Sequence, residues 1–338
     1  MSVQVRSVYR RLVFLTWFFT LDLIMFGAFV RLTDSGLGCP DWPGCYGKIT
    51  PFGASGHIAD AVLQQPYGPV SMSKAWIEMI HRYWGSLLGL LIIAITYMAW
   101  KYRRQLGRSA GLATFCLVAV CLQGAFGAWT VTHKLMPVIV TAHLLGGMLL
   151  LGLMSWLAER EKNHIAIPAG VSFAKPWMAA GLVILFIQIV LGGWVSTNYA
   201  ALACMDFPTC HGQWVPDMDF SGGYSVLRGL GELSSGEIIS QEALTAIHWV
   251  HRNFAIFVFV YLFAIALRLR KEQGLRAPAQ WLILLLLAQV LTGLTTIFFQ
   301  WPLLIAVLHN GGAAGLVIAA VTLLVRLSRA GTDYKVLP

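Results

Sequence analysis

Eight long apolar runs, separated by short polar or basic segments, dominate the pattern of hydrophobic and polar positions along this chain of 338 residues. Each run has roughly the 20 mostly apolar residues that a membrane-spanning helix needs. The first run is long for the apolar core of a signal peptide and has a counterpart later in the chain, so we interpret it as a retained span. The pattern predicts transmembrane helices at Leu12–Val30, Ile77–Trp100, Ala110–Val131, Pro137–Ala158, Trp177–Thr197, Leu244–Leu269, Ala279–Phe299 and Pro302–Leu327.

Composition supports an all-α integral membrane protein. Hydrophobic residues make up 57% of the chain and charged residues only 12%, against about 25% charged residues in a soluble domain. This excludes an ordinary cytosolic enzyme, a disordered protein and a nucleic-acid-binding protein. The net charge of +9 comes mostly from basic clusters in alternate gaps between the runs, as the positive-inside rule describes. We therefore expect both termini to be cytoplasmic and the long segments Arg31–Trp76 and Asn198–Ala243 to face outward.

The two halves of the chain match each other. The pair His81-Arg82 reappears as His251-Arg252, and His143 and His309 each follow a glutamine by 20 positions. Because each half has four predicted spans, both halves enter the membrane in the same sense. This predicts a parallel repeat of two four-helix bundles, residues 1–160 and 161–338. A shift of 165 positions places Gly27, Val30, Leu37, Cys39, Asp41, Pro43, Cys45 and Gly47 on Gly192, Val195, Leu202, Cys204, Asp206, Pro208, Cys210 and Gly212.

Four histidines lie at similar depth in the predicted spans. His81, His143, His251 and His309 fall on the second, fourth, sixth and eighth runs, roughly 6–11 Å below the outer edge at the helical rise per residue. Two imidazoles on alternate helices of one bundle can approach one metal ion from opposite sides. Without a cysteine or carboxylate cluster beside them, they favour a haem iron with two axial histidines over zinc. The alternative is a set of histidines that hydrogen-bond between helices.

Arg82 and Arg252 directly follow two of these histidines. Near the outer surface they are placed to meet haem propionates. The alternative is that their side chains extend to the membrane interface.

The halves differ next to these histidines. Glu78 lies three residues before His81, on the same helix face, whereas His248 occupies the equivalent position before His251. This difference predicts proton or cation chemistry beside a ring bound in the N-terminal half, and a permanent cofactor in the C-terminal half. His248 competes with His251 as a ligand, and the repeat favours His251. Asp22, within the first run, fits either a proton path or a contact with a neighbouring hydroxyl.

Cysteines occur in two settings. Two of them, Cys116 and Cys121, lie in the third run and are interpreted as small apolar residues. The other four lie in the outward segments at identical spacing, where an oxidising compartment favours a local disulfide in each pair. A metal site is the competing interpretation. These pairs are Cys39 with Cys45 and Cys204 with Cys210.

Several motifs together resemble the haem A synthase family, and the resemblance extends over all eight runs. The segment from Arg31 to Cys45, RLTDSGLGCPDWPGC, resembles the first outer loop of that family. Glu78-Met-Ile-His81-Arg82 resembles its Glu-x-x-His-Arg motif. The remaining histidine motifs are matched by Ala142-His143 with Gly146-Gly147, by His251-Arg252, and by His309-Asn-Gly-Gly.

The resemblance implies a bacterial inner-membrane oxidoreductase that oxidises the C8 methyl group of haem O to a formyl group, giving haem A for terminal oxidases. It implies lipid and haem O as partners, and a handover from haem O synthase suits so insoluble a substrate. Whether copies form a homo-oligomer is left open. By resemblance, Glu78 is the catalytic carboxylate, His81 and His143 hold the substrate haem, His251 and His309 ligate a haem b cofactor, and Cys39–Cys45 and Cys204–Cys210 are paired cysteines of the periplasmic loops.

Two other functions remain as hypotheses at this point. A di-haem b-type electron carrier would use the same histidines but would need no carboxylate at Glu78. A transporter would also suit a parallel repeat, but would contain no haem.

Overall fold

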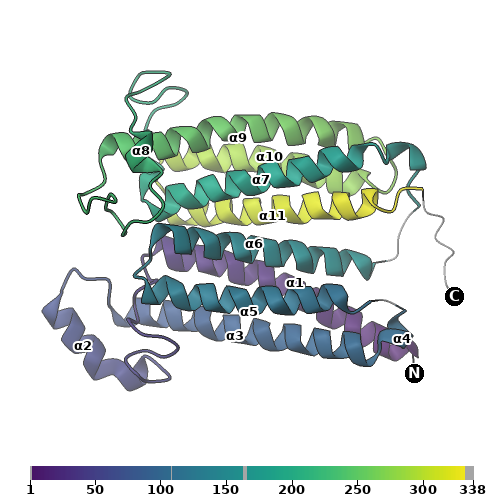
Figure 1. Cartoon of the computed structure of the whole chain (residues 1–338), viewed down its shortest axis with the longest axis horizontal. Coiled ribbons are helices and arrows are strands. Elements are labelled where there is room, and N and C mark those ends of the chain that lie inside the picture. Colours follow the sequence, from purple (N-terminus) through teal and green to yellow (C-terminus); the bar gives the residue numbers. More distant parts are fainter. Residues whose placement is uncertain (1, 108, 163–165, 332–338) are drawn as a thin grey trace.

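The computed structural model describes residues 2–107, 109–162 and 166–331, in which long α-helices run side by side (Figure 1). Among these residues, eight helices are long and apolar enough to cross a membrane, which confirms the predicted all-α class and number of spans. The long helices are α1 (Ser2–Leu32), α3 (Met72–Lys101), α5 (Gly111–Thr132), α6 (Pro137–Arg160), α7 (Ala174–Thr197), α9 (Gln241–Leu269), α10 (Arg276–Phe298) and α11 (Leu303–Leu327). Short helices are α2 (Ser55–Gln64), α4 (Arg103–Leu106) and α8 (Phe220–Gly223).

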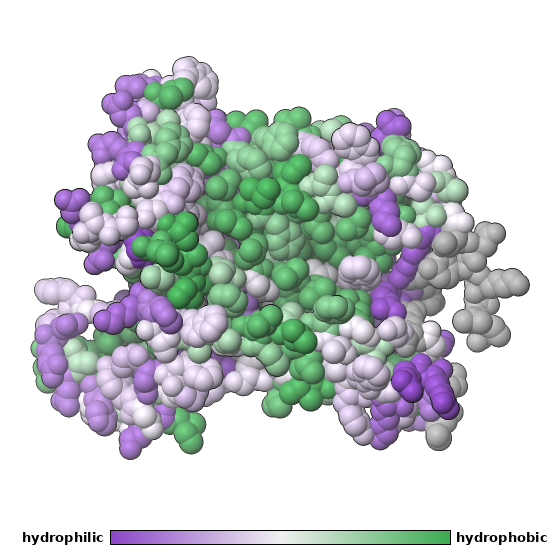
Figure 2. All heavy atoms as spheres, viewed as in Figure 1, coloured by the Kyte–Doolittle hydropathy of each residue, from purple (hydrophilic) through white to green (hydrophobic). Residues whose placement is uncertain are grey.

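The surface of the helices is apolar where lipid would contact it. Figure 2 shows a hydrophobic band across the middle of the molecule, with hydrophilic residues gathered towards both ends. Large apolar side chains of the long helices are exposed, including Leu90 at 63%, Phe115 at 67% and Trp281 at 62%. A water-soluble protein rarely exposes contiguous apolar surface on this scale, so the band fits the hydrocarbon core of a bilayer.

Several helices begin earlier than the apolar pattern predicts, and for α3 and α9 the reason is a polar cap. The structure starts α3 at Met72 and α9 at Gln241, several residues before the apolar runs. The hydroxyls of Ser71 and Ser240 cap these helices by accepting a hydrogen bond from a backbone N–H three residues further on. The caps extend both helices beyond the apolar region, towards the polar outer loops.

The long helices form two groups of four. Helices α1, α3, α5 and α6 pack together and are called the N-terminal group; α7, α9, α10 and α11 pack together and are called the C-terminal group. The groups lie side by side in Figure 1, with α1 and α6 facing α7 and α11. Met148 and Leu151 of α6 share one buried apolar cluster with Val317 and Val321 of α11. The parallel-repeat relation and the division into two domains stay predictions.

Polar contacts join the two groups at both ends. At the end with the long loops, Arg31 donates hydrogen bonds to the backbone oxygen of Ser196 at 2.7 Å and to the hydroxyl of Tyr199 at 2.9 Å. At the opposite end, Arg326 donates to the buried carboxylate of Glu159 at 2.7 Å. These contacts, with the apolar cluster between them, hold the groups in register.

The long loops, which carry α2 and α8, lie at one end of the molecule (left in Figure 1). Helix α1 begins, and helix α11 ends, at the other end. This arrangement puts the start of the first span and the end of the last on one side. The side of the membrane that each end faces stays a prediction from the charge pattern.

Candidate functional site

A large cavity extends between the helices on the side of the long loops. Its volume is about 1390 Å³, above the ~300–1,000 Å³ of a typical pocket for one small molecule. All eight long helices contribute to its wall, most of which is apolar. The cavity brings together the four histidines that the sequence singled out, His81, His143, His251 and His309. It has room for more than one flat, apolar ligand.

Each of the four imidazoles lies against a glycine of the neighbouring helix. A Cβ atom added to Gly27 or Gly192 would lie 2.9 Å from the nearest imidazole atom, closer than real Cβ contacts. These two positions therefore need glycine for the ring to approach the backbone. The pairs are Gly27 with His81, Gly127 with His143, Gly192 with His251, and Gly293 with His309.

In the C-terminal group, both imidazoles also contact a polar side chain. His251 Nδ1 lies 3.0 Å from Nε2 of Gln188, on α7. His309 Nδ1 lies 2.9 Å from the hydroxyl of Thr292, on α10. Such contacts fix the orientation of a histidine and decide which ring nitrogen carries its proton.

In the N-terminal group, the imidazoles meet backbone instead. Within the described part of the chain, the buried Nδ1 of His143 has no hydrogen-bond partner at normal distance, and the ring interacts with the backbone of Gln123. Nε2 of His81 faces the backbone of α1, at Gly27 and Leu23. These rings are thus held by packing against a helix rather than by a polar side chain.

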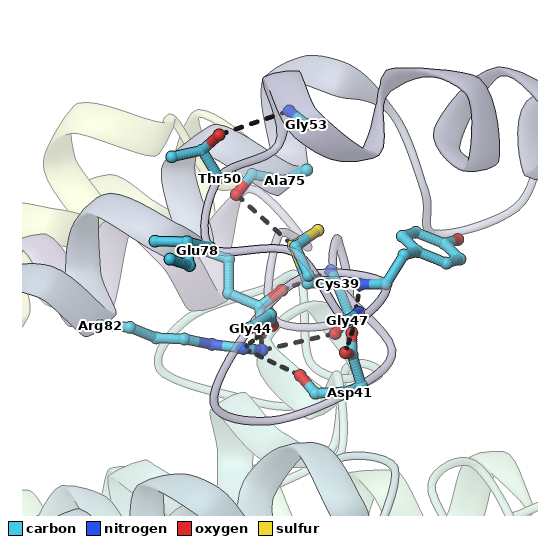
Figure 3. The surroundings of a disulfide bond; sticks show 12 residues. Cys39, Asp41, Gly44, Gly47, Thr50, Gly53, Ala75, Glu78 and Arg82 are labelled. Atoms are coloured by element: carbon cyan, nitrogen blue, oxygen red, sulfur yellow. Dashed lines mark hydrogen bonds and ion pairs between the residues drawn. A yellow bond between two sulfur atoms is a disulfide. The ribbon is translucent and has the colours of Figure 1, made fainter.

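Glu78 lies on the cavity wall but is only 3% exposed. Its carboxylate accepts a hydrogen bond from the backbone N–H of Cys39 at 2.8 Å and forms an ion pair with Arg82 at 2.5 Å (Figure 3). The acid is therefore fixed between its own helix and the first outer loop. A buried carboxylate with a backbone donor and a charged partner is well oriented at the edge of the cavity.

The two arginines that follow histidines are bonded differently. Arg82 donates to the backbone oxygens of Asp41 at 2.8 Å and Gly44 at 2.6 Å, in addition to Glu78. Arg252 donates only to the second outer loop, at Thr209 and a neighbouring carbonyl, and among the described residues its buried Nη1 has no partner. Arg252 thus keeps a donor for an anionic group in the cavity, whereas Arg82 is engaged by the loop.

His248 takes the place of Glu78 in the C-terminal group. Its Nδ1 accepts a hydrogen bond from the backbone N–H of Cys204 at 3.2 Å, as the Glu78 carboxylate does from Cys39. Both residues therefore anchor the first cysteine of an outer loop to a long helix. For His248 this contact occupies one ring nitrogen.

The two outer loops have closely similar cores. The disulfides Cys39–Cys45 and Cys204–Cys210 are formed, which confirms the predicted pairing and removes the metal-site alternative for these cysteines. Within the second loop, Asp206 accepts from the backbone N–H groups of His211 and Gly212 and from the hydroxyl of Thr209, and these bonds lower its pKa to about 2. Asp41 binds the first loop in the same way, through the N–H groups of Tyr46 and Gly47.

The donor set of the cavity suits a haem better than a bare metal ion. Across the described residues, no cluster of three or more His, Cys, Asp or Glu side chains is arranged to hold a metal ion. Each helix group instead supplies two imidazoles to an apolar cavity, which fits an iron whose remaining ligands belong to a porphyrin. Asp22 is not among the residues that line the cavity.

Sequence reasoning missed the residues that surround the histidines. Gln188 and Thr292 are polar positions inside apolar runs, and their counterparts under the repeat are Leu23 and Phe126. That difference was visible in the sequence. Its meaning depends on which helices pair, and this is known only from the fold.

Comparisons with known proteins agree with the motifs. A family model described as a cytochrome oxidase assembly protein (COX15-CtaA) matches residues 10–321. The chain is 39% identical over 311 residues to a protein named heme A synthase from Shewanella oneidensis, covering 91% of this chain and 93% of that one. It is 30% identical over 326 residues to a heme A synthase from Sphingopyxis alaskensis, with 90% and 87% coverage. A heme A synthase from Nitrosomonas eutropha is 28% identical over 333 residues, with 90% coverage of both chains.

Proposed function

This chain belongs to the COX15-CtaA family of cytochrome oxidase assembly proteins, and from that premise we propose that it is a haem A synthase. The proposed reaction oxidises the C8 methyl group of haem O to a formyl group, and the haem A produced serves terminal oxidases. The formyl carbon is four electrons more oxidised than the methyl carbon, so an external electron acceptor takes part.

One observation carries the proposal: a single cavity is lined by two pairs of histidines, and only one pair has an acid beside it. In the N-terminal group, Glu78 lies one helical turn before His81, on the same helix. In the C-terminal group, His248 occupies that place. A chain that only relayed electrons between two haems would need no acid at one of them.

The N-terminal group is proposed to bind the substrate. His81 and His143 hold haem O, and Glu78 lies at the edge of the cavity where positive charge would develop on the oxidised carbon. The ion pair with Arg82 and the hydrogen bond from Cys39 keep the carboxylate in place. Preorganised charge of this kind stabilises a transition state without reorganisation during the reaction.

The C-terminal group is proposed to bind haem b as a resident cofactor. The residues present fit it, since His251 and His309 line the cavity and the unpartnered Nη1 of Arg252 offers a donor to a propionate. When bound, haem b supplies reversible one-electron chemistry near the substrate. The protein contributes two oriented imidazoles and an apolar enclosure that excludes water.

The setting is proposed to be a bacterial inner membrane, with both termini cytoplasmic and the disulfide-bearing loops periplasmic. Basic clusters in alternate gaps support this orientation, and the two disulfides fit the oxidising side of the membrane. Haem O would arrive from haem O synthase, because so apolar a molecule is poorly soluble in water.

The test is to produce the full chain in cells that make haem O but lack haem A synthase. Haem extraction followed by chromatography should show haem A only when the chain is present. Purified protein should also contain haem b with two imidazole ligands. Haem b without any haem A would favour a di-haem electron carrier, and the absence of all haem would favour a transporter.

A further inference from the structure

We propose that Gln188 and Thr292 are positioning residues that make the C-terminal haem resident, whereas the apolar side chains of Leu23 and Phe126 at the matching places leave the N-terminal haem exchangeable. This inference rests on the proposed function, because it concerns how each helix group holds its haem. It explains how two similar sites can treat one kind of ligand as cofactor and as substrate.

Thr292 lies with its hydroxyl between the backbone of its own helix and the ring of His309. Its Oγ1 lies 2.8 Å from the backbone oxygen of Ala288 and 3.2 Å from that of Gln289. A carbonyl oxygen only accepts, so the hydroxyl has an acceptor for its single proton within its own helix. In the tautomer with the proton on Nδ1 of His309, the 2.9 Å contact is then a hydrogen bond that Thr292 accepts. Nε2 of His309 is left with a free lone pair, which an iron ligand needs.

Gln188 can do the same for His251. Its amide nitrogen lies 3.0 Å from Nδ1 and 3.2 Å from the backbone oxygen of His251, while its buried Oε1 has no partner among the described residues. When Nε2 of His251 binds iron, Nδ1 carries the proton. Half a turn of the amide then presents the unpartnered oxygen to that proton, in exchange for the bond from the amide nitrogen to the backbone oxygen of His251.

The N-terminal group has the same helix pairs and glycines, but among the described residues its two imidazoles meet backbone groups, at Leu23 and Gln123, instead of polar side chains. Leu23 lies 165 positions before Gln188, and Phe126 lies 166 positions before Thr292. Neither side chain has a hydrogen-bonding atom. Among the described residues, Nδ1 of His143 accordingly has no side-chain partner.

The expected consequence is a difference in how firmly iron is held. A partner that accepts the Nδ1 proton orients the ring and raises the basicity of Nε2, and its loss typically lowers metal affinity by about 10–100-fold. A cofactor site gains from this, since it should keep its haem through every turnover. A substrate site should bind haem O and then release haem A, so weaker ligation is an advantage there.

The experiment uses the purified full-length protein and apomyoglobin as a soluble haem acceptor. Thr292→Val keeps the shape of the side chain but removes the oxygen, and should speed the transfer of haem b to apomyoglobin by about 10-fold. The reduction potential of haem b should rise, because a less basic imidazole stabilises ferric iron less. Thr292→Ser should restore both values. Gln188→Leu should act in the same direction through His251.

A matched control lies one turn further along α10. The hydroxyl of Thr295 also donates to a backbone oxygen, that of Leu291 at 2.7 Å, and among the described residues it has no hydrogen bond to an imidazole. Thr295→Val should therefore change neither haem transfer nor potential. In the reverse direction, Phe126→Thr should slow the loss of haem O or haem A, which extraction separates from haem b.

The outcomes distinguish this inference from the proposed function. If Thr292→Val and Gln188→Leu leave the transfer rate and potential of haem b unchanged while haem A is still made, the inference is wrong and the proposed function holds. If both variants loosen haem b but even the unaltered chain makes no haem A, the inference holds and the proposed function is wrong. Equal effects of Thr292→Val and Thr295→Val would also overturn the inference.

Discussion

The N-terminal and C-terminal groups have a common helix arrangement and differ in the side chains next to their histidines. In both groups, each histidine packs against a glycine of the next helix, and a disulfide loop is anchored to the helix that carries the first histidine. The differences are few. Glu78 is replaced by His248 at the loop anchor, and the apolar Leu23 and Phe126 are replaced by Gln188 and Thr292 beside the imidazoles.

This comparison shows how similar binding sites can serve different roles. Glycines and apolar packing set where the imidazoles lie, and those features are common to both groups. The acid is present only where a substrate is proposed to react. Side-chain partners for Nδ1 are present only where a cofactor is proposed to remain. Variants that exchange or remove these side chains test whether the N-terminal group is the substrate site and the C-terminal group the cofactor site.

The largest expected effect is that of Glu78→Gln. The amide keeps an oxygen for the N–H of Cys39 but loses the charge, so the loop should stay anchored while the chemistry fails. Haem A formation should fall by about 10²–10³-fold, the loss typical of removing one preorganised electrostatic group. Haem extraction from membranes measures this, and haem b content should stay normal. His248→Gln is the matched control and should lower haem A formation far less. Normal haem A from Glu78→Gln would contradict the catalytic role.

The next largest effect is expected when one histidine of either pair is replaced, because each pair is proposed to ligate a different haem. His309→Met should deplete haem b or change its spectrum from that of two imidazole ligands, because the C-terminal pair is proposed to ligate the cofactor. His143→Met should leave haem b in place and reduce the bound haem O and haem A. Optical spectra and haem extraction of the purified variants measure both. Unchanged haem b spectra in His309→Met would refute this assignment.

Removing either disulfide should reduce haem A formation moderately, and the loss should be larger for the first outer loop than for the second. Each bond closes a loop with a sequence separation of 6. By chain entropy, removing one bond should lower the free energy of unfolding by about 2 kcal/mol. Serine at Cys39 and Cys45 should reduce haem A formation, since the N–H of Cys39 holds Glu78. Serine at Cys204 and Cys210 should reduce it less, because that loop is anchored to His248. Equal losses in the two double variants would argue against the link between loop and acid.

The smallest effect is a pH dependence of the second outer loop. The hydrogen bonds to Asp206 lower its pKa from 3.8 to about 2. A lowered pKa means that the carboxylate stabilises the loop fully above pH 3.8 and loses this effect as the pH falls through about 2. Amide hydrogen exchange at His211 and Gly212 should show protection that persists in mild acid. In Asp206→Asn, this protection should be weaker above pH 3.8, and the difference should disappear as the pH falls through about 2. Similar exchange in both proteins would show that the carboxylate does not hold the turn.

The sequence by itself determined the features that depend on local chemistry. The length of each apolar run determined the number of spans, because a helix must satisfy its backbone hydrogen bonds across the bilayer. The spacing of Cys39 and Cys45 allowed a local disulfide, as did that of Cys204 and Cys210. The capping serines lie outside the apolar runs and do not stand out in a hydrophobic pattern. The starts of α3 and α9 were therefore predicted too late. The helix α2 inside the first long loop was not predicted, because the segment is rich in turn-forming residues.

Only the tertiary structure decided which side chains meet across helices. Gln188 reaches His251 from another helix, 63 positions away, and the N–H of Cys39 reaches Glu78 from a loop, 39 positions away. The rotation and pairing of apolar helices depend on close packing at small residues such as Gly27 and Gly192, rather than on a hydrophobic pattern. Since lipid and protein interiors are about equally apolar, the sequence pattern alone cannot say which face of a membrane helix turns inward.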